Sequence, residues 1–524
     1  MDNLLQNVTR NVCDNVRKKL GIENGEVPLI KRNKTLKNGD FQVPLNGLRK
    51  LLDKNTVGIN ASQLEEKLKE GSFGELICKN NLSDDKLFLF LRRSAVFQQE
   101  VCRILTSEGT WTQARTEQNV LLTAPYLGLR EKSLSQLRTI LLSQHIAKLL
   151  EVNGCNVKCD VSEDLEGIVK STCSKTRTES DKDHISELYE KLKNSEYYEE
   201  SEDNSIIINY KDLIQKKHLL QGKDQYDKNM EKSIVTAGDE KLKILSSLRM
   251  VRQDFSKEES TCIHVTTANF DFTTQQVDLL WQIIGDAPRQ QLHVPHGPVV
   301  TKPADGDSVP SAEEFLRLRE EETKQAFQMK YGDCVSGDEW ASIVKELSQA
   351  AINFDLLSTS CKSSVKLDIS HSADGEVENR AGVFVMYNYA RLATLMQHFQ
   401  EAVSNGTYGP LPDVAEIDFN LLKEEGEWEL MFNYVLPYPN LLQDCIADLT
   451  KNMVKPKIHT HKICQFLLDL SRDLSSYYCR VHVLGEGLTH LLPQMYARLS
   501  LLQAVKKLME HALQLLNITA ISQL

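Results

Sequence analysis

The chain has 524 residues, 41% of them hydrophobic and 26% charged, and this ordinary composition excludes a collagen-like or wholly disordered protein. Its formal net charge of −11 argues, taken alone, against a protein that binds nucleic acid. The charge is uneven, however, because it is +7 over residues 1–150, −16 over 151–379 and −2 over 380–524. Binding depends on the local field rather than on the total, so the basic N-terminal part keeps nucleic acid open as a ligand.

The cysteines and the hydropathy argue against several other classes of protein. None of the 12 cysteines forms a C-x-x-C pair, so we expect no zinc site, and we expect no cofactor. No run approaches 18 apolar residues, and the first ten residues lack the apolar region of a signal peptide, so we expect no membrane span. These features together predict a cytoplasmic protein with free thiols.

Residues 1–115 predict an N-terminal accessory domain. The apolar run at 86–91 has the length of a strand, and residues 97–105 have the pattern of a helix. Basic side chains gather early in this part and fit either a solvated face or a surface that meets phosphate groups. They are Arg17, Lys18, Lys19, Lys31, Arg32, Lys34 and Lys37.

Residues 116–311 predict a Rossmann-like α/β domain. A strand at 119–124, a helix at 134–149 and a second strand near Val157 form a β-α-β unit, which implies a parallel sheet. Residues 160–260 are rich in Asp, Glu, Lys and Ser, and they predict a flexible insertion. Order returns in the segments that follow, with strands predicted at 262–266 and 292–295, a helix at 275–284, and a strand or turn at 298–300.

The rest of the chain predicts helices. They are indicated at 312–330, 338–357, 380–404, 427–450, 458–479 and 490–516. In the last of them, apolar residues recur every three or four positions, as on one face of an α-helix. The expected fold class is therefore α/β plus all-α, with a helical connector at 312–379 and a helical bundle at 380–524.

Four blocks in this bundle carry a resemblance to a known family. They are Gly382-Val-Phe-Val-Met-Tyr-Asn-Tyr-Ala-Arg-Leu392, Glu427-Trp-Glu-Leu430, residues 470–481 and residues 497–518. In this order they resemble the anticodon-binding domain, or DALR domain, of class I arginyl-tRNA synthetases. The chain departs from that pattern at Asn517, where the family usually has glycine, and two residues are missing before Cys479. Residues 86–104 are similar to the end of the family's N-terminal domain, which touches the tRNA elbow.

The resemblance extends to the predicted Rossmann-like domain, but the family's signature motifs are absent. Residues 137–157 resemble the first Rossmann helix of these synthetases, which a His-x-Gly-His motif precedes in the family. Here that position holds Ser133, Leu134, Ser135 and Gln136. The lysine-rich second motif should follow residues 293–297, and only Lys302 stands there. Since these motifs stabilise charge on the ATP phosphates, the resemblance implies that the chain is not an enzyme. We expect His293 and His296 to be ordinary loop residues.

Aromatic and basic side chains of the bundle are the candidate RNA-binding residues, because rings stack on unpaired bases and cations contact phosphates. Tyr387 and Arg391 share a helix face, whereas Tyr389 points away, so we expect one tyrosine inside and one facing RNA. For each tyrosine, packing in the core stays an alternative to RNA binding. For the basic residues of 451–462, the alternative is a solvated loop that does not bind RNA. The candidates are Tyr387, Tyr389, Arg391, Lys451, Lys455, Lys457, Lys462, Tyr478, Arg480 and Arg498. Trp428 we expect to be a core anchor.

The function that the resemblance implies is that of a non-catalytic tRNA-binding adaptor. It implies arginine tRNAs as the ligand and support for their anticodon-loop modification by a tRNA 3-methylcytosine methyltransferase. The sequence shows no Gly-rich loop of the methyltransferase kind, so the methylation has to come from that partner. Two alternatives stay open: an active arginyl-tRNA synthetase with a remodelled site, and a protein scaffold that does not bind RNA.

Overall fold

The computed structural model describes residues 4–20, 31–33, 36–44, 46, 76–83, 86–106, 111–112, 118–127, 133–161, 179–201, 205–253, 260–302, 309–331, 337–368, 381–451, 453–485 and 487–522. The chain divides into two compact units. Unit 1 comprises Met1–Gln113, Arg391–Asn440 and Leu470–Met509, and unit 2 comprises Ala114–Ala390, Leu441–Asp469 and Glu510–Leu524. Each unit joins segments that are far apart in the sequence, so the predicted boundaries near 115, 311 and 379 stay predictions.

Unit 1 contains an antiparallel sheet with the strand order β1-β2-β4-β3. Its strands are β1 (Lys31–Arg32), β2 (Phe41–Pro44), β3 (Ile77–Ser83) and β4 (Lys86–Leu91). Leu87, Leu89 and Leu91 are buried because alternate residues of β4 point to the same face. The predicted strand at 86–91 is confirmed, and the helix predicted after it is α4 (Arg93–Thr106). Helix α1 (Leu4–Leu20) precedes the sheet.

Trp428 anchors the core of unit 1, as predicted. It lies on α14 (Glu425–Leu430), is buried, and donates from its indole nitrogen to Asp40 Oδ1 at 2.8 Å. The other carboxylate oxygen of Asp40 accepts from the Leu91 amide at 2.6 Å. Burial raises the pKa of Asp40, which these two donors oppose. One buried side chain thus ties α14 to the sheet.

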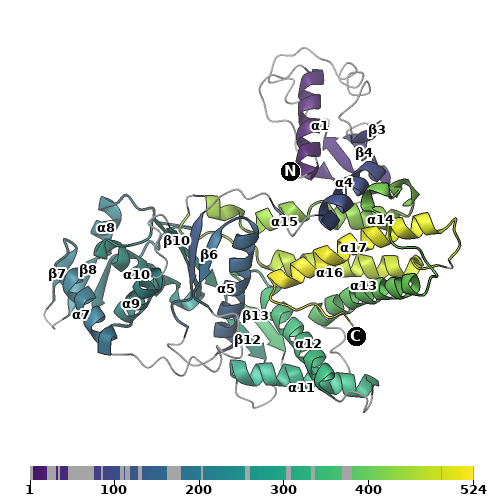
Figure 1. Ribbon diagram of the computed structural model, residues 1–524. Coiled ribbons are helices and arrows are strands. Elements are labelled where there is room, and N and C mark those ends of the chain that lie inside the picture. Colours follow the sequence, from purple (N-terminus) through teal and green to yellow (C-terminus); the bar gives the residue numbers. More distant parts are fainter. Residues whose placement is uncertain are drawn as a thin grey trace. The chain divides into compact units, whose positions relative to one another are not determined.

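Unit 2 is built on a four-stranded parallel sheet with the order β11-β10-β5-β6. Two of its strands, β6 and β10, are labelled in Figure 1. The strands are β5 (Asn119–Thr123), β6 (Asn156–Cys159), β10 (Ser260–Thr267) and β11 (Gln290–His296). Helix α5 (Leu134–Val152) connects β5 to β6, and α10 (Asp271–Ile284) connects β10 to β11. The predicted β-α-β unit and its parallel sheet are confirmed.

The flexible insertion predicted at 160–260 is wrong for the residues described in that range. They form α7 (Glu179–Lys193), β7 (Tyr198–Glu200), β8 (Ile206–Asn209), α8 (Tyr210–Lys216), β9 (Lys232–Val235) and α9 (Glu240–Gln253). Leu213, Leu245 and Trp281 belong to one buried cluster that joins these elements to α10. The charged residues misled the prediction because they cover the surface of a small apolar core. Residues 162–178, 202–204 and 254–259 lie outside the described part.

The remaining elements of the described chain are mainly helical, and two parallel strands, β12 (Val299–Lys302) and β13 (Val365–Asp368), pair beside them. The longer helices are α11 (Ala312–Tyr331), α12 (Asp338–Leu357), α13 (Ala381–Ser404), α16 (His461–Arg480) and α17 (Leu492–Leu515). The single helix predicted at 427–450 is wrong. It is divided into α14, a π-helical turn (Met431–Val435) and α15 (Tyr438–Cys445), around Pro437, which has no amide to donate. No helix among the described residues is long and apolar enough to span a membrane.

Candidate nucleic-acid interface

Arg391 and Tyr478 form a stacked pair within unit 1. The Arg391 guanidinium lies 4.4 Å from the centre of the Tyr478 ring, and its Nη1 donates to Ser475 Oγ at 3.4 Å. Arg391 comes from α13 and the other two residues from α16, and both Arg391 and Tyr478 are partly exposed. A planar cation on an aromatic face is a suitable surface for an unpaired base and its phosphate. The structure therefore brings two of the predicted candidates together.

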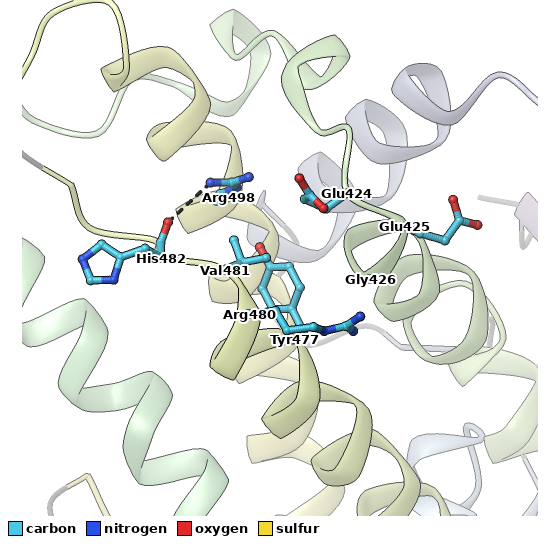
Figure 2. A pocket seen from close by; sticks show the side chains of 8 residues that line it. All are labelled: Glu424, Glu425, Gly426, Tyr477, Arg480, Val481, His482 and Arg498. Carbon is cyan, nitrogen blue, oxygen red and sulfur yellow. Dashed lines mark hydrogen bonds between the residues drawn. The ribbon is translucent and has the colours of Figure 1, made fainter.

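A pocket of about 360 Å³ lies at the end of α16 (Figure 2). Its lining includes Tyr477 and Arg480 from α16, Glu424 and Gly426 from the start of α14, and His482. Figure 2 shows the His482 ring pointing away from the other labelled side chains. Arg480 is exposed, and its Nε donates to the Ser476 carbonyl at 3.1 Å. The lining also holds the carboxylates of Glu424 and Glu425, so the exposed Arg480 guanidinium, rather than the pocket as a whole, is the group suited to contact a phosphate.

Gly426 packs tightly against the wall of this pocket. A Cβ atom added there would lie 3.0 Å from Cδ2 of Tyr477, so the tyrosine ring would have to move by a few tenths of an ångström to accept it. Tyr477 itself is buried and donates its hydroxyl to Glu427 at 3.4 Å, and burial is the main reason that its pKa is raised. Tyr477 is thus a fixed wall of the pocket.

Arg498 is also part of the wall, which corrects its prediction as an RNA contact. Its Nε donates to Oε1 of the fully buried Glu427 at 2.8 Å, and only 13% of its side chain is exposed. A buried ion pair is disrupted if one partner turns to another ligand, so Arg498 serves packing.

The two tyrosines of α13 differ in exposure. Tyr387 is 48% exposed, whereas Tyr389 is only 4% exposed. The predicted division into one inner and one outer tyrosine is therefore confirmed, and Tyr389 is removed from the RNA-binding candidates. Their burial differs because residues two positions apart on a helix point in different directions.

The basic segment at 451–462 in unit 2 is less positive than its sequence indicates. Lys451 pairs with Asp448 at 2.5 Å, and Lys455 pairs with Asp271 at 3.1 Å with 15% of its side chain exposed. Lys455 is therefore corrected from an RNA contact to a residue that holds the loop. Among the described residues, Lys457 and Lys462 have no ion-pair partner, and Lys457 is exposed.

Residues 133–136 form a helix cap in unit 2. The amide of Gln136 donates to Ser133 Oγ, and the Gln136 side chain accepts from the Ser133 amide, both at 3.3 Å. Ser135 Oγ accepts from the Val299 amide at 3.0 Å, and Leu134 is buried. These contacts fix the start of α5, and the capping side chains that make them are neutral.

A pocket of about 550 Å³ adjoins this cap at the carboxyl ends of β5, β10 and β11. Ligands of parallel sheets bind at this edge, where the strand order reverses. Thr267, Asn269 and Phe270 share the lining with the capping residues, and among the residues that the structure describes no lining residue carries a charge. Within the described residues, no cluster of His, Cys, Asp and Glu is able to hold a metal ion.

His293 and His296 are buried on β11, so their prediction as loop residues is wrong. His293 Nε2 lies 3.0 Å from Asp278 Oδ2, and His296 Nε2 lies 2.8 Å from Thr139 Oγ1. Burial lowers the pKa of His296 to about 4. Both rings therefore belong to the polar core of the sheet.

Sequence reasoning missed a second aromatic surface, in unit 1. Phe88 and Phe90 lie on β4 opposite its buried leucines, both are partly exposed, and Lys79 Nζ lies 5.3 Å from the centre of the Phe90 ring. The alternation of Leu and Phe at 87–91 was the signal, because successive strand residues point to opposite faces.

Comparison with known proteins identifies the family. Residues 385–524 match the DALR anticodon binding domain. DALR anticodon-binding domain-containing protein 3 of Danio rerio is 32% identical over 530 residues, which cover 94% of this chain and 92% of that protein. This chain belongs to that family. The Rattus norvegicus member is 31% identical over 464 residues, or 84% of each chain.

The fold of this family member is that of an arginyl-tRNA synthetase. The Thermus thermophilus arginyl-tRNA synthetase aligns with a TM-score of 0.64 and 15% identity, over 99% of this chain and 100% of that one. At this identity the likeness concerns the fold alone. The predicted parallel α/β domain followed by a helical DALR domain is confirmed.

Proposed function

We propose that this protein is a non-catalytic tRNA-binding adaptor. The observation that carries the proposal is the partly exposed Arg391–Tyr478 stack within the segment that matches the DALR anticodon binding domain. Stacking on an aromatic ring contributes about 1–3 kcal/mol per base, and it tolerates any base. Arg480 adds an exposed cation to the same unit, and Phe88 with Lys79 supplies a second surface of the same chemistry.

Arginine tRNAs are the ligand that we propose, and a tRNA 3-methylcytosine methyltransferase is the partner. The likeness to arginyl-tRNA synthetases supports the choice of tRNA. On this proposal the adaptor presents the anticodon loop, and the partner supplies the methyl-transfer chemistry. A pull-down of the full chain with that methyltransferase, with and without arginine tRNA, tests the partnership.

The absence of synthetase activity is part of the proposal. Ser133 and Gln136 are engaged in capping α5, and the described lining of the adjoining pocket holds no cation for a triphosphate. ATP–pyrophosphate exchange with arginine is the deciding measurement. Measurable exchange would instead support an active synthetase with a remodelled site.

Binding to tRNA is tested by gel shift with the full chain, using an arginine tRNA and a tRNA for another amino acid. We expect binding that weakens strongly between about 50 and about 200 mM salt, because phosphate contacts release counterions. Arg391→Ala or Arg480→Ala should lower the affinity and reduce the salt slope by about 1 each. Arg317→Ala, at an exposed position of α11, is the matched control.

One outcome would contradict the adaptor function, and another would contradict the surface assigned to it. If the chain does not bind tRNA at low salt, either alone or with the methyltransferase, it is not a tRNA adaptor. A scaffold that binds only proteins would then be the remaining hypothesis. Equal affinity of Arg391→Ala, Arg480→Ala and Arg317→Ala would place the tRNA surface elsewhere.

A further inference from the structure

A second polar pocket, of about 430 Å³, lies in unit 2 where β11 begins. This is the opposite edge of the sheet from the Ser133 pocket, which lies where the strands end. The lining comes from three separate stretches: the insertion at 217–226, the end of α10 with the start of β11, and residues 453–454. The volume is within the range of small-molecule sites, about 300–1,000 Å³.

The floor of this pocket is held in one arrangement by a buried carboxylate. Asp278 accepts hydrogen bonds from the Tyr226 hydroxyl at 2.7 Å, from Gln282 Nε2 at 3.0 Å and from Gln291 Nε2. All three donors line the pocket. Gln282 Nε2 also donates to the Tyr226 oxygen at 2.9 Å. The Gln282 backbone carbonyl accepts from Lys217 Nζ at 3.2 Å. Since the side-chain amide nitrogen is also engaged, the side-chain oxygen Oε1 of Gln282 is left to accept from a ligand.

The charges and walls of the pocket define what would fill it. Among the described residues of its lining, Lys217 and Arg289 are the charged ones, so this lining is cationic in a protein of net charge −11. Both residues are exposed. Leu219, Met453 and Val454 make part of the wall apolar. The site thus combines cations, an apolar slot and amide groups.

We propose that this pocket binds a single nucleotide. The phosphate would meet Lys217 and Arg289, and the base would lie against Leu219 and Met453. Its edge would then reach the Gln282 oxygen and the Gln290 amide, which can both donate and accept. A bare phosphate would contact only the cations and would leave the amides and the apolar wall without a partner. Both a free nucleoside monophosphate and an unpaired nucleotide of an RNA have this chemistry.

The first arm of the test is calorimetric titration of the full chain with AMP, GMP, CMP, UMP and inorganic phosphate at low salt. We expect one saturable site for at least one nucleotide, with affinity above that of phosphate. Lys217→Glu and Arg289→Glu should each weaken it by about tenfold or more, because each removes a charge-assisted contact. Lys223→Glu, an exposed neighbour in the same insertion, should leave it unchanged.

The second arm distinguishes an RNA nucleotide from a free one. If no monophosphate binds, the tRNA affinities of the variants are compared. A lower affinity in Lys217→Glu and Arg289→Glu than in Lys223→Glu assigns the pocket to a nucleotide of an RNA. Phosphate binding as tightly as every nucleotide overturns the proposal, as does the absence of any effect in both arms. The first arm needs no tRNA, so its result does not depend on the proposed adaptor function. Far-ultraviolet circular dichroism of each variant verifies folding.

Discussion

Arg138 is a fully buried cation that donates only to backbone carbonyls. Its guanidinium reaches the carbonyls of Leu356, Gly297, Thr359, Ser360 and Ser363 at 2.6–3.3 Å. Burial lowers its pKa, although an arginine keeps its proton in proteins. One side chain of α5 thereby fixes the segment that leads into β13.

We predict that Arg138→Met lowers the free energy of unfolding by about 3 kcal/mol or more, because it leaves buried carbonyls without donors. Arg138→Lys should recover only part of the loss, since an ammonium lacks the planar fork of donors. Urea denaturation measures both. Arg317→Met, on the exposed face of α11, is the control, and equal stability of the two methionine variants would contradict the prediction.

At the scale of elements, α12 and α13 approach so closely that only glycine fits between them. A Cβ atom added at Gly382 would lie 2.4 Å from the carbonyl oxygen of Ala350. This contact explains the glycine that opens the first family-like block of the sequence. The close packing of α12 and α13 therefore depends on glycine at this position, because glycine has no Cβ atom.

Gly382→Ala should destabilise the protein by about 3 kcal/mol, because the two helices must separate or bend. Alanine has a higher helix propensity than glycine, but this gain of about 1 kcal/mol is too small to compensate for the steric clash. Thermal unfolding measures the effect. Gly238→Ala is the control, since nothing lies within 4 Å of the added atom, and a Gly382→Ala melting temperature as high as the control's would contradict the packing.

At the scale of the whole molecule, two buried histidines and the partly buried His511 make stability depend on pH. Burial lowers the pKa of His264, His296 and His511 to about 4. These groups bind protons more readily in the unfolded chain, whose ordinary pKa is about 6.5. Stability is therefore complete above about pH 6.5 and decreases as the pH falls toward 4.

Each such histidine should cost about 2 kcal/mol of stability between pH 7.5 and pH 5. Replacing His511 by glutamine should reduce the loss on acidification, whereas His490→Gln, at an exposed position, should leave it unchanged. Urea midpoints at both pH values provide the comparison. The same loss in both variants would show that His511 does not titrate as proposed.

The sequence by itself determined which local elements form. The strand at 119–123, the helix at 134–152 and the long C-terminal helices follow from apolar spacing, and neighbouring residues alone set that period. The order of short blocks also indicated the family, which the relatives confirm. Residues 179–253 are rich in charged side chains, and this composition gave no sign of their buried core. Few apolar residues are enough to form such a core when several elements contribute to it.

Only the tertiary structure decided which of the candidate residues are available to a ligand. Lys455 is paired with Asp271, 184 positions away, and Arg391 meets Ser475 across 84 positions. The pocket beside Lys217 and Arg289 likewise joins stretches that are distant in the sequence. Residue type and spacing define the charge and shape of a side chain, but its partner and its exposure arise from long-range packing, which local patterns do not contain.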